Sequence, residues 1–450
     1  MKAFLNNLIL KILTLAIGRD ISVVATLTTS IFPKTSVEII RDIQVTVPRA
    51  IEEPIVPGAG FSRIQALTSM QTAAGNKDMR WLAGQGVLLE NYYAVTHPSE
   101  PNYIAAVGGD TFGLQNDRYH RIPANISTVI ELLDTKQIPW AEYQEDFSYS
   151  DVQGTNGEGY VRKHDPLSSY DIISNNATRM ARIKNFTNFE QDLTSKNLPQ
   201  WAFFTPNIRN DGHDTGLAFA GRWLHKWLGP LLKNDYFMNG TLIVVTFDEA
   251  KQGDIPNKVF TVLLGGAVDP SLRGTTDKMY YNHYSMLSTV SVNWDLPSLG
   301  RWDCDANVFS VLANKVGYNN TDIAYQGLSW NVSYPGPLND VQDLPGWWPR
   351  PDTEAKCATG RGVLESVKSV WGTSRGSYNY TNVYPYNNKY HATKGGIPAI
   401  GVNDASSSIN PPNATQSQTG STGGSKNGGS LTKTAPVSLA LLLFVITAIP

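Results

Sequence analysis

The stretch NYYAVTHPSEPNYIAAVGGD, residues 91–110, places Ser99 between two prolines, where an apolar run ends and a run of small residues begins. Residues 86–95 are apolar enough for a buried strand, and Pro101 suits the first turn of a following helix. Ser99 is then either an ordinary helix cap or a nucleophile, because helix-terminal N–H groups also favour phosphate. The stretch therefore predicts a strand, a turn and a helix, with Ser99 at the turn.

Three more apolar runs have the length of strands, and helical patterns lie among them. The runs cover 201–205, 242–246 and 259–264, and the helical patterns cover 126–136 and 217–234. Alternating strands and helices predict an α/β fold, with a parallel or mixed sheet covered on both faces. Because ligands bind beyond the carboxyl ends of the strands in such sheets, the polar residues that follow the runs are candidates for a site.

Polar clusters do follow these runs. They are THPSEPNY at 96–103, NDGHDTG at 210–216, the Asp248–Glu249 pair and, later, YYNHYSMLSTVSVNW. They supply carboxylates and imidazoles but no thiolate, and this donor set suits hydrolytic Zn, Mn, Fe or Mg sites. Each cluster also has an ordinary interpretation: a surface turn around Asp211, a solvated helix start at Asp248, and a buried core histidine at His283.

The composition indicates a folded protein with no electrostatic preference for a particular partner. The chain has 450 residues, 41% of them apolar, and a formal net charge of −2. This is enough to bury a sizeable core, and it provides no basic field for nucleic acid. No internal repeat is visible and no linker precedes Asn403, so we expect a single domain over 56–402.

The two ends of the chain differ from the middle. Segment 1–55 is atypical, because Lys11 interrupts its apolar stretch and no clean cleavage site follows, which makes it a poor signal peptide. Residues 403–428 form a Ser/Gly/Asn/Thr-rich linker, and 429–450 end in an apolar tail too short to span a bilayer comfortably. This pattern predicts a GPI-attachment signal that is removed at Asn427, and an extracellular protein held at the cell surface or wall through that anchor alone.

Cysteines and sequons agree with passage through the secretory pathway. Cys304 and Cys357 are the two cysteines, and they either form one bridge or remain two buried thiols. Eight Asn-x-Ser/Thr sequons are candidate glycosylation sites: Asn125, Asn176, Asn185, Asn239, Asn319, Asn331, Asn379 and Asn413.

The motifs RKHDPLSSY at 162–170, NDGHDTG, TFDE at 246–249 and YNHYSMLSTVSVNWDLPSLGRWD at 281–303 accompany the Ser99 stretch in a fixed order. Over residues 76–307 the chain resembles fungal secreted acid phosphatases of the phosphoesterase family, within the alkaline-phosphatase-like superfamily. The resemblance implies an alkaline-phosphatase-like sandwich with a central, mostly parallel sheet and helices on both faces. It also implies that the protein hydrolyses small phosphate monoesters outside the cell through a phosphoseryl intermediate.

The resemblance assigns roles to individual residues. Ser99 is the nucleophile, and His164 protonates the leaving oxygen. Divalent metal ions are held at two positions, the first by Asp248 and Glu249 and the second by Asp211, His213 and His283. Substrate oxygens are bound by His97, Asn102, Arg162 and Lys163, although a solvated basic turn is an equal interpretation of the last two.

One departure from the family pattern concerns the start of the domain. Members typically begin with an apolar strand that ends in a metal-binding Glu-Asn pair, whereas this chain has Ala66 and Leu67 there and no apolar strand before them. The chain is then either a degenerate paralogue or carries a mistranslated or misspliced beginning. Two alternative functions follow: a phosphodiesterase or phospholipase C on the same fold, and a catalytically impaired cell-surface glycoprotein.

Overall fold

The computed structural model describes residues 55–61, 63–65, 69–70, 76–149, 159–251, 257–322, 337–339, 347–372, 396–398 and 441–445. These residues belong to one compact unit that begins at Ile55. The predicted N-terminal segment before Ile55 and the predicted linker lie outside the described residues, as do the candidate sites Asn331, Asn379, Asn413 and Asn427. The predictions made for them stay predictions.

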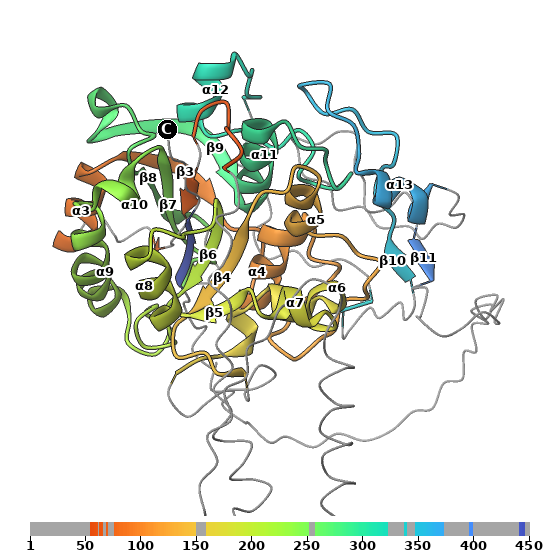
Figure 1. The fold of residues 1–450 in the computed structure, drawn as a ribbon, viewed down its shortest axis with the longest axis horizontal. Coiled ribbons are helices and arrows are strands. Elements are labelled where there is room, and N and C mark those ends of the chain that lie inside the picture. Colours follow the sequence, from red (N-terminus) through yellow and green to blue (C-terminus); the bar gives the residue numbers. More distant parts are fainter. Residues whose placement is uncertain are drawn as a thin grey trace, which may run out of the picture. The chain divides into compact units, whose positions relative to one another are not determined.

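A six-stranded sheet forms the centre of this unit (Figure 1). Its strands, in spatial order, are β1 (Arg63–Gln65), β7 (Thr241–Phe247), β12 (Leu441–Val445), β6 (Trp201–Thr205), β4 (Trp140–Gln144) and β5 (Ile183–Asn185). β12 is antiparallel to both of its neighbours, and the other pairs are parallel. The sheet is therefore mixed. The strands are parallel, as the sequence predicts for most of the sheet, in every pair that does not include β12.

Two smaller sheets complete the strands. One has the order β2 (Ser69–Met70), β8 (Val259–Leu264), β3 (Val87–Tyr93) and β9 (Thr275–Asn282), and the other pairs β10 (Trp347–Pro349) with β11 (Gly396–Pro398). β3 and β9 are parallel, whereas β8 is antiparallel to both neighbours. β7 and β8 meet through their side chains, because the hydroxyl oxygens of Thr246 and Thr261 lie 2.6 Å apart.

Helices cover both faces of the central sheet (Figure 1). One face carries α3 (Lys77–Gly84), α8 (Phe186–Thr194), α9 (Leu217–Leu231) and α10 (Asp235–Met238), and the other carries α4 (Ser99–Gly108), α5 (Val129–Asp134) and α11 (His283–Trp294). Alternate residues of a strand serve the two faces: Leu242 and Val244 of β7 pack in one core, and Ile243 and Val245 in the other. The α/β fold with two helical layers is confirmed, and the finer alkaline-phosphatase-like architecture stays a prediction.

Shorter helices lie along the connections. They are η3 (Arg162–His164), η4 (Leu167–Ser169), α6 (Asp171–Ser174), α7 (Ala177–Met180), η5 (Pro270–Leu272), α12 (Ser310–Val316) and α13 (Glu365–Trp371). Of these, η3 contributes to the candidate site. A disulfide joins Cys304 to Cys357, whose Cα atoms are 5.1 Å apart.

Two short strands, β1 and β12, lie between β6 and β7. At the strand starts, Ile64 of β1 pairs with Trp201 and with Leu242. At the strand ends, Leu441 of β12 lies opposite Phe247, the residue before Asp248. The strand that precedes Ala66 is therefore short and carries Arg63 and Gln65, so it is not the apolar strand of the family pattern; Ala66 and Leu67 themselves lie outside the described residues.

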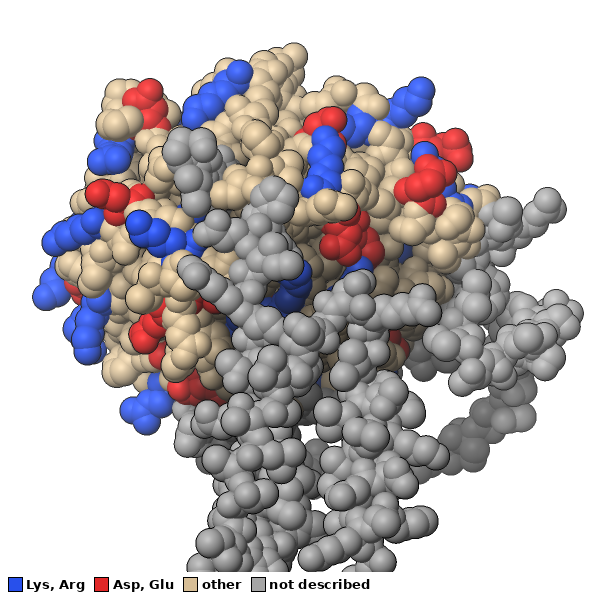
Figure 2. Space-filling model, in the orientation of Figure 1, with Lys and Arg blue, Asp and Glu red and all other residues tan. Residues whose placement is uncertain are grey.

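The face of the unit shown in Figure 2 carries charges of both signs. Basic and acidic side chains are intermixed on the face shown in Figure 2, in keeping with the net charge of −2. No helix in the described part of the chain is long and apolar enough to cross a bilayer.

Candidate active site

Ser99 lies where the sequence predicts, at the first residue of α4 and shortly after β3. The Asn102 amide fixes this turn: Oδ1 accepts from the N–H groups of Val95 (2.9 Å) and Thr96 (3.1 Å), and Nδ2 donates to the carbonyls of Thr96 (2.8 Å) and Pro98 (3.1 Å). These four bonds use the full capacity of an amide. Asn102 is therefore a clamp for the turn, and no amide atom remains for the substrate-binding role predicted for it.

The Ser99 hydroxyl is directed at a carboxyl group from another strand. Ser99 Oγ donates to Glu249 Oε1 at 3.1 Å, and both residues are at most 1% exposed. Burial raises the pKa of Glu249 well above its usual range, which makes its carboxylate a stronger base. On the other oxygen, His97 Nδ1 lies 2.5 Å from Glu249 Oε2. His97 thus contacts the base, and burial lowers its own pKa to about 4.

Three carboxyl groups gather beside Ser99 from two strand ends. Asp248 and Glu249 follow β7 and Asp211 follows β6, and all three side chains are 0% exposed. Burial raises the pKa of Asp211 well above its usual range. Burial raises the pKa of the Tyr103 hydroxyl, on α4, and the charges of these three carboxyl groups raise it further. Polar residues after separate strands have therefore met at one place, as the sequence predicts.

His164 pairs with one of these carboxyl groups. Its Nδ1 lies 3.2 Å from Asp211 Oδ2, and its ring stacks on Tyr103 with centroids 4.9 Å apart. Burial, reinforced by the nearby Lys163 charge, lowers the pKa of His164 well below its usual value. Nε2 is buried and has no hydrogen-bond partner among the described residues. A histidine with Nδ1 on a carboxylate and Nε2 available has the arrangement of a proton carrier.

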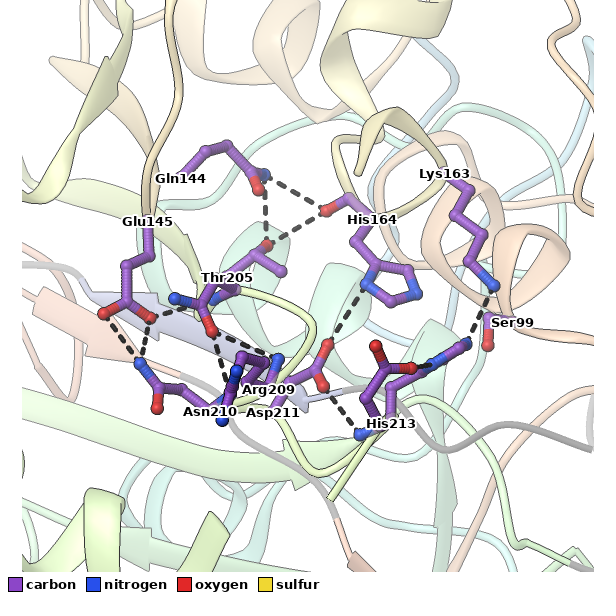
Figure 3. A network of polar contacts seen from close by, with 12 residues as sticks. Ser99, Gln144, Glu145, Lys163, His164, Thr205, Arg209, Asn210, Asp211 and His213 are labelled. Atoms are coloured by element: carbon purple, nitrogen blue, oxygen red, sulfur yellow. Dashed lines mark hydrogen bonds and ion pairs between the residues drawn. The ribbon is translucent and has the colours of Figure 1, made fainter. Parts of the chain in front are cut away.

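Lys163 projects into the same site (Figure 3). Its Nζ donates to Asp117 Oδ2 at 2.9 Å and lies 3.1 Å from His213 Nε2. His213 Nδ1 lies 2.7 Å from Asp214 Oδ1, so both of its ring nitrogens contact side chains of the protein. The ammonium group and both ring nitrogens of His213 thus have partners within the chain, and the roles predicted for them in phosphate and metal binding stay predictions.

The Arg162 guanidinium pairs with a carboxylate of the protein itself. Its two terminal nitrogens bind the Glu100 carboxylate at 2.6 and 2.9 Å, and one of them also reaches Ser169 Oγ at 3.0 Å. Arg162 and Glu100 are 5% and 1% exposed. This buried bidentate pair ties η3 to the first turn of α4, and it leaves Arg162 without the free terminal nitrogens that its predicted contact with phosphate needs.

Both ring nitrogens of His283 contact other groups of the protein. Its Nε2 lies 2.7 Å from the Asp248 carbonyl, and its Nδ1 lies 3.1 Å from the Tyr92 hydroxyl. Burial lowers its pKa to about 4, so the ring is neutral and donates from Nε2 to the carbonyl. His283, at the start of α11, thereby holds the backbone of Asp248 in place, and both of its nitrogens are occupied.

The carboxylates among the predicted metal ligands suit a divalent cation, but they do not form a complete set of ligands around one position. Asp211 Oδ2 and Glu249 Oε2 are buried, with His164 Nδ1 and His97 Nδ1 as their neighbours, and such carboxylate oxygens favour a hard cation. However, the described residues whose potential ligand atoms lie within 4.8 Å of one another are Cys304, Asp305 and Cys357. The sulfur atoms of the two cysteines are bonded to each other. The residues present therefore offer carboxylates to a cation, and further ligands would have to complete the site.

Sequence reasoning missed three residues that the structure places around the site. Asp117 holds Lys163, Tyr103 stacks on His164, and Gln144 donates to the His164 carbonyl at 3.1 Å. Asp117 lies in a polar loop, and Gln144 is the last residue of β4, whose sequence is WAEYQ. Neither position carries a local signal, because each role depends on a partner more than 15 residues away.

Comparisons with known proteins place this geometry in a family. Residues 65–297 match the model of the family described as "Phosphoesterase family". An "Acid phosphatase" of Aspergillus fumigatus is 49% identical over 372 residues, which cover 78% of this chain and 83% of the relative. A "Phosphate-repressible acid phosphatase" of Penicillium chrysogenum is 42% identical, covering 80% and 92%. A "Phosphatidylinositol-3-phosphatase" of Mycobacterium tuberculosis is 32% identical, covering 52% and 75%.

Proposed function

The chain belongs to the phosphoesterase family, and from this premise we propose that it transfers the phosphoryl group of a monoester to Ser99 and then to water. Its relatives make it a phosphoric monoester hydrolase. The observation that carries the proposed route is the Ser99 hydroxyl, which starts α4 and donates to a buried carboxylate 3.1 Å away. The N–H groups at the start of α4 favour the negative charge of the phosphate.

In the first step Glu249 accepts the Ser99 proton while Oγ forms a bond to phosphorus. The bond from phosphorus to the leaving oxygen breaks, and that oxygen takes the proton of His164 Nε2 while Asp211 passes its own proton to Nδ1. In the second step His164 Nε2 takes a proton from the attacking water and Nδ1 returns one to Asp211, and Glu249 returns its proton to Ser99 as orthophosphate leaves. Each residue therefore ends the cycle as it began, and the Lys163 ammonium holds phosphate oxygens in both steps.

We propose that Asp248 and Glu249, with Asp211 nearby, would hold a divalent cation at this site. When bound, such a cation lowers the pKa of a neighbouring hydroxyl and offsets the charge of the phosphate. The test is metal content: purified protein dialysed without chelator should retain metal, and replacing Asp248 with Asn should reduce the amount retained. A metal-free wild type that hydrolyses phosphate esters at full rate would contradict this part of the proposal.

The direct test of the route is Ser99→Ala. We expect the rate of hydrolysis of a chromogenic phosphate monoester to fall by on the order of 10³-fold or more, because no oxygen remains to accept the phosphoryl group. The control is Ser195→Ala, which removes an exposed hydroxyl that donates to the Gln191 carbonyl at the end of α8. Equal activity of Ser99→Ala and wild type would refute the nucleophile.

One specific observation favours the second candidate function, an impaired cell-surface glycoprotein. Leu441 of β12 lies opposite Phe247, the residue before Asp248, and the described carboxylates form no closed ligand shell. If wild type neither retains metal nor hydrolyses mono- or diesters, this second function replaces the first. A diester rate that exceeds the monoester rate would instead favour the phosphodiesterase.

We also propose that the protein acts outside the cell. The candidate glycosylation sites Asn176, Asn239 and Asn319 are exposed, whereas both amide atoms of Asn125 are buried and offer no access to a glycan. We therefore expect peptide mapping of protein from the culture medium to find glycans at the three exposed sites and none at Asn125. A chain without any glycan would contradict secretion.

A further inference from the structure

A layer of buried polar side chains lies beneath His164, where β4 and β6 end. The Gln144 amide donates to the His164 carbonyl at 3.1 Å and to Thr205 Oγ1 at 3.0 Å, and the Thr205 hydroxyl donates to the same carbonyl at 3.0 Å (Figure 3). Gln144 and Thr205 are 2% and 1% exposed. The backbone of His164 is thus held from below by two strand ends.

Two carboxyl groups complete this layer. Glu142 precedes Gln144 on β4, and the Gln144 amide donates to Glu142 Oε1 at 2.7 Å. Asp165 directly follows His164; its Oδ2 accepts from the Tyr160 hydroxyl at 2.8 Å and its Oδ1 from the Ser168 N–H at 3.1 Å. Both carboxyl groups are 0% exposed, so neither has water to stabilise a negative charge.

The Glu142 and Asp165 carboxyl groups lie close enough to hydrogen-bond, and Glu142 Oε2 has no other partner among the described residues. An ionised carboxylate can only accept a hydrogen bond, so a bond between two carboxyl groups requires a proton on one of them. Burial raises the pKa of both groups above their usual range. The pair can therefore share one proton at a pH where separate carboxyl groups would have lost both.

No cation offsets the charge of the pair. Among the residues that the structure describes, neither carboxyl group forms an ion pair with Lys or Arg. The titratable groups around the pair are Tyr160, which donates to Asp165, and Arg162 and His164 on η3. The Arg162 guanidinium is taken by Glu100, and the His164 ring is directed at Asp211. The shared proton is then what keeps two buried carboxyl groups together.

We propose that Glu142 and Asp165 are a positioning pair, whose shared proton holds the His164 turn in place and makes hydrolysis slow down as the pH rises. The inference rests on the proposed function, because it assigns His164 a place in the reaction. Neither carboxyl group touches the substrate; the pair acts through the backbone that carries His164. Loss of the proton leaves two buried negative charges side by side, and the turn between β4 and η4 has to move to separate them.

The direction of the pH effect follows from the raised pKa values. In the unfolded chain both carboxyl groups ionise near pH 4, whereas the folded pair keeps one proton to a higher pH. The folded state binds more protons than the unfolded state in this window, so stability falls as pH rises through it. Below the ordinary carboxyl pKa both states are protonated, and the pair adds no pH dependence there.

The test is Glu142→Gln, because a Gln amide can donate to Asp165 at every pH. We expect the alkaline pH at which kcat has fallen to half its maximum to move upward by at least about one unit. Asp165→Asn is the second variant, and it should move the same midpoint upward. The matched control is Glu145→Gln, a nearby half-buried carboxyl group that accepts from the Asn207 N–H and the Asn210 amide, so its midpoint should stay.

A second readout separates this inference from the proposed function. The unfolding free energy of wild type, measured in urea at a series of pH values, should fall from acid to neutral pH more steeply than that of Glu142→Gln. This measurement needs no activity, so an inactive wild type would refute the function and leave the pair testable. Unchanged alkaline midpoints together with equal stability slopes in Glu142→Gln and wild type would overturn the proposal.

Discussion

At the scale of the residue, Lys163 is the cation closest to the reacting groups, and Asp117 decides where it lies. Asp117 Oδ2 accepts from Lys163 Nζ at 2.9 Å, while its Oδ1 accepts from the Glu100 N–H at 3.0 Å. One carboxylate therefore joins the phosphate-binding ammonium to the first turn of α4, on which Ser99 also lies. This makes Asp117 a positioning residue for the substrate.

We predict that Asp117→Asn raises the KM for a phosphate monoester about tenfold and changes kcat little, because it removes a charge-assisted hydrogen bond to Lys163 but keeps an acceptor for Glu100. Steady-state kinetics checks the split. The control is Asp171→Asn, which removes an ion pair of 2.6 Å with Arg121 elsewhere on the chain and should leave KM unchanged. A fall in kcat at constant KM would contradict the assignment.

The predicted site residues that the structure brings together share a simple property. Ser99, Asp211 and Asp248 follow apolar runs that became strands, and the carboxyl ends of parallel strands bring such residues to one edge. The charge of Arg162 and the ring of His283 suggest a ligand role, whereas their contacts in the structure, Glu100 and the Asp248 carbonyl, are distant in the sequence. Residue type alone cannot tell a side chain that binds substrate from one that positions another.

At the scale of the element, the turn between β3 and α4 is the part of the fold on which the chemistry depends. Four of its hydrogen bonds involve Asn102, which is 0% exposed, and they stabilise the backbone that precedes Ser99. A proline-rich turn without this amide would leave buried N–H groups unpaired.

We predict that Asn102→Ala lowers stability by about 3 kcal/mol, since buried N–H groups lose their acceptor, and lowers kcat by about 100-fold, since Ser99 shifts. Urea unfolding and kinetics measure the two effects. Asn76→Ala is the matched control: this asparagine caps α3 by accepting from the N–H groups of Asp78 and Met79, and its loss should cost about 1 kcal/mol without changing kcat. An Asn102 variant that behaves like the control would remove the turn from the mechanism.

The strands were predictable where they are long and apolar, and unpredictable where they depend on the rest of the sheet. β6, β7 and β8 coincide with apolar runs at 201–205, 242–246 and 259–264. β1 covers three residues, of which one is Arg63, and no periodicity marks it. It forms because β6 and β7 leave backbone groups that need a partner, and that requirement is a property of the sheet.

At the scale of the whole molecule, the C-terminal tail has two incompatible descriptions. In the structure, residues 441–445 form β12 between β6 and β7, with backbone pairs on both sides. The sequence predicts that 429–450 are a GPI-attachment signal, and a chain cleaved at Asn427 would lack this strand. The same residues cannot be both a removed signal and a central strand of the mature protein.

We predict from the structure that Leu443→Pro lowers the melting temperature by at least about 5 °C, because proline removes a backbone donor from the middle of a sheet. A chain ending at Asn427 should lose at least as much, because β6 and β7 then face each other without β12. Circular dichroism melts of the two variants and of wild type measure this. If both variants have the melting temperature of wild type, β12 lies outside the sheet in solution. Mass spectrometry of the mature C-terminus then decides whether the anchor signal is removed.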